Sequence, residues 1–287
     1  MMSSISRDSV VLLIPQNDAE AVQILRIARA FKIETLVSDQ PHGARLEREP
    51  QLLQRLKQTG KLNVVIVEMP GPAVEKAVTD AGFTLYIIDH HRYDELDRMS
   101  DENGQPKPSS LEQFLLLFEV ADNELERHGF DVRLVRGVGA MDRGFIWALQ
   151  RDGYSEEEIK NVSRYVYELS REARGHELTE LNEKIAREAW KLRKQVGEYL
   201  VVTSDVPKAE IRPYLSLLVA QEFGRPTPMV IASRGGLLIY VQDTPKALAL
   251  FEKFGGFTFG QDTCWGYNNA LSSKKLTPSE VLNFLLQ

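Results

Sequence analysis

The sequence predicts an α/β protein with an N-terminal doubly wound parallel sheet and a smaller C-terminal α/β domain, joined by a helical linker. In the first 90 residues, four short apolar runs alternate with segments of helical periodicity. A long polar helical stretch follows Ser155, and strand-like and helix-like segments resume after Glu198. Because strands that alternate with helices are connected by right-handed crossovers, the N-terminal strands are expected to be parallel.

The N-terminal elements follow one another in regular order. The apolar runs predict buried strands at 10–14, 33–37, 64–67 and 84–88. Apolar residues spaced three and four apart predict the intervening helices at 19–31, 52–57 and 73–81. Residues 92–108 are polar and rich in turns, and a loop of that length inside a compact domain is more often functional than idle.

The second half of the first domain contains a helix start and a segment of small residues. Ser109-Ser110-Leu111-Glu112 predicts a capping box that opens a helix at 112–120. Residues 137–145 are rich in glycine and alanine and contain Asp142, which predicts a loop that leads into a helix at 146–150.

The remaining elements define the linker and the second domain. The helical stretch from Ser155 to about residue 197 is expected to break at Gly175. Strands are predicted at 200–203, 229–232 and 237–241, and helices at 211–222, 245–254 and 278–286. The predicted domain ranges are therefore 1–154, 155–197 for the linker and 198–287, with a cleft expected between the domains.

Composition excludes several classes of protein. Hydrophobic residues make up 43% of the 287 residues, as in ordinary globular proteins, yet no apolar run approaches the ~20 residues of a membrane span. The single cysteine, Cys264, excludes an internal disulfide and predicts a cytoplasmic protein. The net charge of -6 argues against broad binding to duplex nucleic acid. We expect no membrane partner, and a homodimer is compatible with the sequence.

Acidic and imidazole side chains follow three of the predicted strands. Asp18 and Glu20 follow the first strand, Glu68 follows the third, and Asp89-His90-His91 ends the fourth. The carboxyl ends of parallel strands meet at one edge of a sheet, where ligands bind. Carboxylates crowded there repel one another unless a cation neutralises them.

Asp142 adds one more carboxylate to the candidate site, from its own segment of small residues. Oxygen ligands together with one imidazole suit Mn²⁺ or Mg²⁺ better than zinc. Each acid alone also has an ordinary interpretation as a helix cap or a solvated loop residue. Asp18 in particular is placed to cap the first helix.

The order of these motifs resembles the DHH phosphoesterase superfamily. The resemblance is carried by Asp89-His90-His91, the acids at the preceding strand ends, Ser109-Ser110-Leu111-Glu112-Gln113 and Met141-Asp142-Arg143-Gly144. That superfamily includes single-strand exonucleases, oligoribonucleases, cyclic dinucleotide phosphodiesterases and manganese pyrophosphatases. The resemblance covers essentially the whole chain, and it implies that the second domain is the associated C-terminal substrate-binding domain.

Site residues can be carried over from the superfamily motif by motif. The implied metal ligands for one or two Mn²⁺ or Mg²⁺ ions are Asp18, Glu20, Glu68, His90 and Asp142. His91, which would face the scissile phosphate, and Asp89 are the implied catalytic residues. In the second domain, Arg234 and the glycine pair Gly255-Gly256 match the family's phosphate-contacting arginine and substrate loop.

Three positions depart from the family pattern. Ile14 stands where the family has a metal-binding histidine, and isoleucine cannot coordinate a metal. Glu20 and Glu68 stand where the family has aspartate, which moves each carboxylate by about 1.5 Å, one carbon–carbon bond. The site that needs Ile14 and Asp18 is therefore impaired, whereas Glu20, Glu68, His90 and Asp142 remain sufficient for one ion.

The glycine-rich segment of the second domain also departs from the family, because it lacks the family's histidine. It is aromatic instead, with Phe257, Phe259, Trp265 and Tyr267. These rings either stack on nucleic-acid bases or pack the core of the small domain.

Two functions remain open from the sequence. The first is a metal-dependent phosphodiesterase that acts on short oligonucleotides or cyclic dinucleotides. The second is a catalytically inactive protein of the same fold that binds nucleotide, nucleic acid or a protein partner. The altered positions favour the second function, and the intact Asp89-His90-His91 and Asp142 favour the first. A pyrophosphatase would need more basic residues near Gly255 than the sequence provides.

Overall fold

The computed structural model describes residues 5–93, 96–207 and 209–287. The chain divides into two compact units. Unit 1 comprises Met1–His90, Asp101–Asp142 and Ala148–Gly175, and unit 2 comprises His91–Ser100, Arg143–Trp147 and His176–Gln287. The two halves of the predicted helical linker thus group with different units, and the break between them falls at Gly175, whose φ is 89°.

Unit 1 is built on a four-stranded parallel sheet, as the sequence predicts, and its strand order is β2-β1-β3-β4. Its strands are β1 (Val10–Pro15), β2 (Glu34–Ser38), β3 (Asn63–Val67) and β4 (Thr84–Ile88). Short 3₁₀ helices occur at Arg7–Ser9 and Leu46–Arg48. The α-helices are α1 (Ala19–Ala30), α2 (Leu52–Thr59), α3 (Pro72–Asp80), α4 (Ser110–Leu117), α5 (Asp122–Arg127), α6 (Val132–Arg151) and α7 (Glu156–Arg174).

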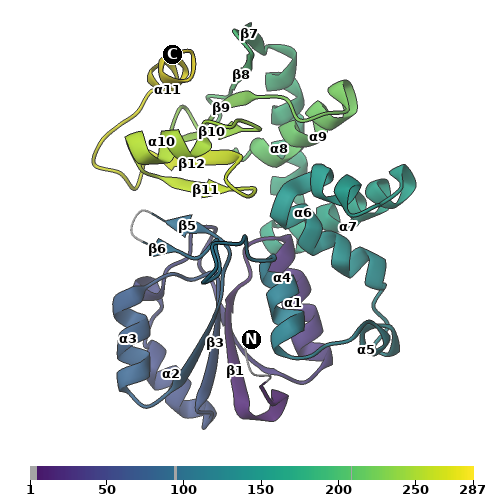
Figure 1. The fold of residues 1–287 in the computed structure, drawn as a ribbon, viewed down its shortest axis with the longest axis vertical. Helices are drawn as coiled ribbons and strands as arrows, with labels where there is room; N and C mark the ends of the chain where they lie inside the picture. Colours follow the sequence, from purple (N-terminus) through teal and green to yellow (C-terminus); the bar gives the residue numbers. More distant parts are fainter. Residues whose placement is uncertain (1–4, 94–95, 208) are drawn as a thin grey trace. The chain divides into compact units, whose positions relative to one another are not determined.

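The sheet of unit 1 has a hydrophobic core on each face, because successive strand residues point to opposite sides. Leu12 and Ile14 of β1 pack with residues of α1, α4 and α7, whereas Val11 and Leu13 pack with residues of α2 and α3. Figure 1 shows α1 and α4 on one side of β1 and β3, with α2 and α3 on the other. Each buried Leu or Ile contributes about 1.5–3 kcal/mol, so the apolar runs fix the sheet.

The prediction of a loop at 137–145 was wrong, because this segment lies within α6. The helix departs from helical geometry only at Gly144 and Phe145. The glycines serve close packing rather than a loop. A Cβ atom on Gly137 would lie 2.5 Å from a methyl carbon of Val162, and one on Gly139 would lie 2.7 Å from Ser109 Oγ.

Unit 2 contains an eight-stranded sheet in the order β6-β5-β11-β12-β10-β9-β8-β7. Only β8 and β9 are parallel among its neighbouring strands. Its strands are β5 (Arg92–Tyr93), β6 (Leu96–Asp97), β7 (Lys194–Val196), β8 (Tyr199–Thr203), β9 (Met229–Ser233), β10 (Leu238–Gln242), β11 (Phe257–Phe259) and β12 (Cys264–Asn268). The sequence did not predict β5, β6, β7, β11 or β12, which are short or interrupted by glycine.

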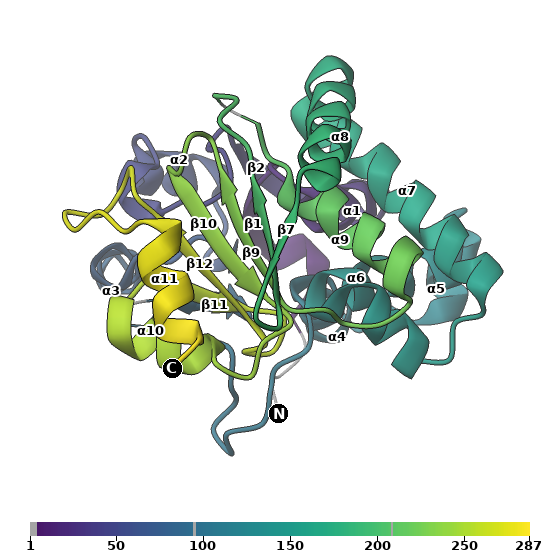
Figure 2. The same ribbon diagram turned by 90° about the horizontal axis from the view of Figure 1, so that it is seen from above.

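The helices of unit 2 are α8 (His176–Lys191), α9 (Arg212–Phe223), α10 (Ala247–Phe254) and α11 (Pro278–Leu285). Figure 2 shows α10 and α11 on one side of the strands, and α8 and α9 on the other. The core on the side of α10 and α11 contains Trp265, Tyr267, Ile239 and Val241. Within the part of the chain that the structure describes, no helix is both long and apolar enough to span a membrane.

Candidate metal centre

The carboxyl edge of the parallel sheet places Glu68 and His90 side by side. Glu68 directly follows β3, His90 lies two residues after the end of β4, and the last residues of these strands are paired, Val67 with Ile88. The Glu68 amide donates to the Ile88 carbonyl at 2.9 Å. Glu68 has a φ of 51°, a left-handed conformation that few residues other than glycine adopt and that functional sites often retain.

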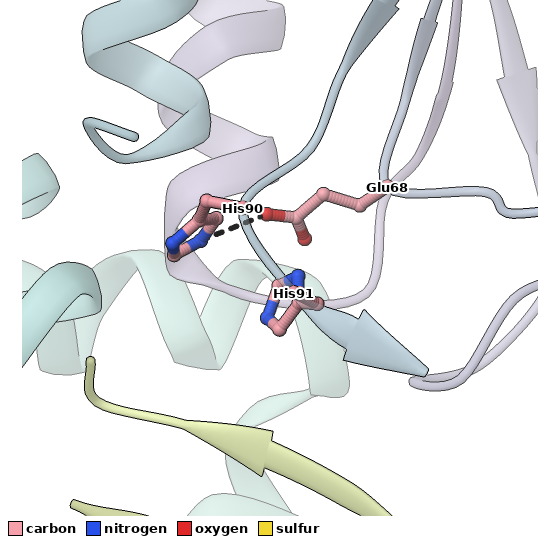
Figure 3. A group of neighbouring side chains, drawn as sticks. All are labelled: Glu68, His90 and His91. Atoms are coloured by element: carbon pink, nitrogen blue, oxygen red, sulfur yellow. Dashed lines mark ion pairs between the residues drawn. The ribbon is translucent and has the colours of Figure 1, made fainter. Parts of the chain in front are cut away.

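Four candidate ligands converge at this edge. One ligand atom from each of Glu20, Glu68, His90 and Asp142 lies within 4.8 Å of all the others. His90 Nε2 lies 2.7 Å from Asp142 Oδ2 and 3.3 Å from Glu68 Oε1. Figure 3 shows the imidazole of His90 directed at the Glu68 carboxylate. We call these four residues the acidic cluster.

Glu20 is the most deeply buried member of the acidic cluster. It lies in the first turn of α1 and is only 2% exposed. Its Oε1 accepts a hydrogen bond from the Leu111 amide at 2.9 Å, whereas its Oε2 is buried without a hydrogen-bond partner among the described residues. Burial, reinforced by the charges of Asp142 and Glu68, raises the pKa of Glu20 well above its ordinary value.

His90 carries the compensating charge within the acidic cluster. Burial by itself lowers its pKa, but hydrogen bonding and charge attraction from Asp142 and Glu68 outweigh this effect. The pKa of His90 is consequently well above its ordinary value, which favours the imidazolium form. The proton on His90 therefore offsets part of the negative charge of the acidic cluster.

The donor set of the acidic cluster fits a divalent cation. Three carboxylates and one imidazole are the oxygen-rich combination that suits Mn²⁺ or Mg²⁺. The unpartnered Oε2 of Glu20 provides an observation that supports this fit, because a buried carboxylate oxygen is costly unless something compensates it. The prediction that Glu20, Glu68, His90 and Asp142 form one group is therefore supported by their geometry.

Asp18 is a predicted metal ligand that the structure does not bring into this group. It is the N-cap of α1, and its Oδ1 accepts a hydrogen bond from the Ala21 amide at 2.8 Å. Its Oδ2 lies 4.0 Å from Nδ1 of His42, a side chain that is 55% exposed. Asp18 therefore caps α1, which is the ordinary interpretation that the sequence gives for this residue. Ile14, where the family has histidine, is fully buried in the core.

Asp89 and His91 flank His90 in the sequence. Asp89 is fully buried, and its backbone carbonyl accepts a hydrogen bond from Gln113 Nε2 at 3.2 Å. His91 also has a ligand atom within 4.8 Å of those of Glu68 and His90, and Figure 3 shows these three side chains together. Their predicted catalytic roles stay predictions.

The residues that the sequence predicts to bind substrate, Arg234, Gly255 and Gly256, lie in unit 2. Arg234 follows β9, and its guanidinium donates to Glu210 Oε1 at 2.6 Å, so this arginine already has an anionic partner. Gly256 has a φ of 95°, and a Cβ atom there would lie 2.3 Å from the Gly266 carbonyl oxygen. The carbonyl of Gly255 accepts a hydrogen bond from Trp265 Nε1 at 2.8 Å. This packing requires glycine at position 256 for structural reasons alone.

The four aromatic residues of this segment separate into two pairs. Trp265 and Tyr267 are 0% and 4% exposed and belong to the core of unit 2. Phe257 and Phe259 are partly buried and pack instead against Tyr240, with ring centroids 6.3 and 6.2 Å from that of the tyrosine. Trp265 and Tyr267 therefore pack the core of unit 2. Stacking on nucleic-acid bases stays a prediction for Phe257 and Phe259.

Sequence reasoning missed two groups that contact the acidic cluster. Ser110 Oγ donates to Glu68 Oε1 at 2.7 Å, and the Leu111 amide donates to Glu20. Both groups lie in the first turn of α4, which the sequence predicts only as a capped helix start. The sequence signal for the first contact is Ser110, the serine that follows the N-cap Ser109.

Similar proteins are found among solved structures. No family model matches the chain, and a search of curated proteins found no match. The chain is similar to a DHH domain from a protein described as a member of a family of ribosomal proteins, at 16% identity and a TM-score of 0.49, covering 85% of this chain and 78% of that one.

Two further similar structures have titles that name an enzyme. One is exonuclease RecJ bound to manganese, at 14% identity and a TM-score of 0.45, covering 96% and 93% of the two chains. The other is PggH of Vibrio cholerae, a pGpG-specific phosphodiesterase, at 11% identity and a TM-score of 0.41, covering 96% and 97%. At these identities and TM-scores, activity, substrate and metal do not transfer to this chain.

Proposed function

We propose that the acidic cluster is the metal centre of a phosphoesterase that hydrolyses phosphodiester bonds in short oligonucleotides or cyclic dinucleotides. The observation that carries the proposal is the convergence of three carboxylates and one imidazole at the carboxyl edge of a parallel sheet, with Glu20 Oε2 buried and unpartnered among the described residues. A cation would relieve the repulsion that this arrangement creates.

Each residue near the cluster has a role in this proposal. Glu20, Glu68, His90 and Asp142 would hold one Mn²⁺ or Mg²⁺ ion. When bound, such an ion polarises a phosphoryl oxygen and lowers the pKa of a coordinated water. His91 would donate a hydrogen bond to the scissile phosphate, and the buried Asp89 would fix the end of β4 that carries both histidines.

The second unit would bind the rest of the substrate in this proposal. Arg234 would neutralise a phosphate, for which it must share or leave the carboxylate of Glu210. Gly255 and Gly256 would allow the substrate to approach the backbone closely. The cytoplasm remains the proposed compartment, supported by the free thiol of Cys264, and a homodimer stays a prediction.

Calorimetry with Mn²⁺, together with hydrolysis of a short RNA and of a cyclic dinucleotide, tests the proposal. The wild-type protein should bind Mn²⁺ and cleave at least one substrate. His90→Ala should abolish both functions, because it removes the imidazole nearest to Asp142 and Glu68. His42→Ala is the matched control, since this histidine faces Asp18 and lies outside the acidic cluster. Absence of Mn²⁺ binding by wild type would refute the proposal.

A catalytically inactive binding protein is the second candidate. It is favoured by the burial of Ile14 and by the use of Asp18 as a helix cap, because these two positions then offer no ligands for a second ion. Under this alternative, wild type binds a dinucleotide but leaves it intact in the presence of Mn²⁺. Restoring the missing ligand by Ile14→His should then produce hydrolysis only if that ligand limits the reaction.

A further inference from the structure

Three aromatic rings gather on one face of the sheet of unit 2. The ring centroid of Tyr240 in β10 lies 6.3 Å from that of Phe257 and 6.2 Å from that of Phe259, both in β11. Ile239 and Val241, the neighbours of Tyr240, pack in the core on the side of α10 and α11. Because successive strand residues alternate, Tyr240 points to the other side. The three rings are partly buried, and we call them the aromatic face.

Phe257 lies across the neighbouring strand β12. It pairs with Gly266, and a Cβ atom on that glycine would lie 2.4 Å from Cζ of the Phe257 ring. The ring thus occupies the space that a side chain at position 266 would fill. A partly exposed ring in this place turns one side to the sheet and the other outward. Aromatic rings on the face of a sheet are a known means of stacking nucleic-acid bases.

Arg212, the first residue of α9, lies over the other two rings of the aromatic face. Its Cζ lies 4.7 Å from the ring centroid of Phe259 and 5.6 Å from that of Tyr240. Among the described residues, its guanidinium has no hydrogen-bond or ion-pair partner, whereas Arg92 and Arg234 each pair with a carboxylate. A guanidinium held against rings and left without an anion is pre-organised to bind one.

We propose that Arg212 and the aromatic face bind a nucleotide, with its phosphate on the guanidinium and its base stacked on Phe257. This inference rests on the proposed function for the part that the site plays in it, which is recognition of the substrate base. The planar N–H donors of arginine match the oxygens of a phosphate, and every base has a face that stacks on an aromatic ring. The described residues place no cation over Phe257, so this ring is left for the base.

The test is calorimetric titration of the full-length protein with AMP and with ribose 5-phosphate, which carries the phosphate without the base. EDTA is present throughout, so that no metal at the acidic cluster contributes. Wild type should bind AMP more tightly than ribose 5-phosphate. Phe257→Leu should weaken AMP binding by about fivefold or more and leave ribose 5-phosphate unchanged, because only stacking is lost. Arg212→Gln should weaken both probes by about tenfold or more, because both use the guanidinium.

Matched controls separate these effects from a general loss of stability. Phe284→Leu removes a partly buried ring that packs in the core on the side of α10 and α11. Arg187→Gln removes an arginine of α8 that is paired with Glu183. Neither change should alter the affinity for either probe. Phe257→Tyr keeps the ring and should retain the wild-type affinity for AMP, with folding of every variant checked by circular dichroism.

Equal affinity of wild type for AMP and ribose 5-phosphate would reduce the site to an anion site and overturn the inference. Unchanged AMP binding in folded Phe257→Leu would also overturn it. If Phe257→Leu does not fold, the partly exposed Arg212 still tests the site, and wild-type affinity in Arg212→Gln overturns the inference. A wild-type protein that binds Mn²⁺ but not AMP overturns this inference alone. AMP binding with the expected losses, in a protein that binds no Mn²⁺, supports the nucleotide site and overturns the proposed phosphoesterase.

Discussion

Glu20→Gln should stabilise the metal-free protein while weakening its binding of metal. The ligand atoms of Glu20, Glu68 and Asp142 lie within 4.8 Å of one another, and at that separation each pair of like charges costs about 3–4 kcal/mol at an effective dielectric constant of about 20. The imidazolium of His90 offsets roughly one of the two repulsions on Glu20. The glutamine keeps the acceptor for the Leu111 amide and removes the charge, a gain in stability of about 3 kcal/mol once the pH exceeds the raised pKa of Glu20.

The pH dependence of this gain follows from the raised pKa of Glu20. Burial and the neighbouring carboxylates raise it above the ordinary 4.5, so the folded wild type gains stability from holding the proton. That stability is complete below pH 4.5 and is lost as the pH rises through the raised pKa. Glutamine does not titrate, so the advantage of the variant should be near zero below pH 4.5 and should grow as the pH rises toward the raised pKa of Glu20.

Thermal unfolding in EDTA measures the effect. A gain of about 3 kcal/mol corresponds to an increase in melting temperature of about 6–12 °C for a unit of this size. Glu49→Gln is the control, because Glu49 is a buried acid of the same unit that is paired with Arg55 and accepts hydrogen bonds from Ser38 and Gln40. It should destabilise by about 3–5 kcal/mol. A Glu20→Gln protein less stable than wild type at pH 8 would refute the reasoning.

Three further predictions concern other parts of the structure. Mn²⁺ affinity should fall by up to about tenfold per pH unit below the raised pKa of His90, because the imidazole must lose its proton to bind metal; calorimetry that shows no pH dependence would contradict this. Gly139→Ala should lower the unfolding free energy by about 1–3 kcal/mol in urea, since its Cβ would lie 2.7 Å from Ser109 Oγ; an unchanged midpoint would contradict the packing. Burial raises the pKa of Cys264 to about 11, so Ellman's reagent at pH 8 should react only after unfolding, and rapid reaction of the native protein would contradict its burial.

The parallel sheet could be predicted because its signals are local. Each strand of unit 1 begins and ends within one residue of its predicted bounds, since an apolar run and its flanking turn are both read from neighbouring residues. The acidic edge of the sheet could be predicted from the same strands, because parallel strands bring their carboxyl ends together. Glu68 and His90 therefore came together as predicted.

The missed features depend on residues far apart in the sequence. Gly137 looked like a loop residue, but its small size serves contact with Val162 of a later helix. Strands β5 and β11 are too short to show periodicity, and their pairing joins Arg92 to Thr258 across more than half of the chain. The donation of Ser110 to Glu68 likewise requires knowing which helix start faces which strand end.

The acidic cluster is difficult to explain as a device for folding. A buried carboxylate with an unpartnered oxygen destabilises a fold, and apolar residues of similar volume are often more stabilising in such positions. Ile14 and Asp18 show the contrast, because one joins the core and the other caps α1, and both contribute to stability. Glu20, Glu68, His90 and Asp142 instead combine repulsion with a left-handed backbone at Glu68. The unfavourable interactions are concentrated in these four residues, whereas Ile14 and Asp18 stabilise the fold. For this reason we favour a single ion at this centre, held by the four residues of the acidic cluster.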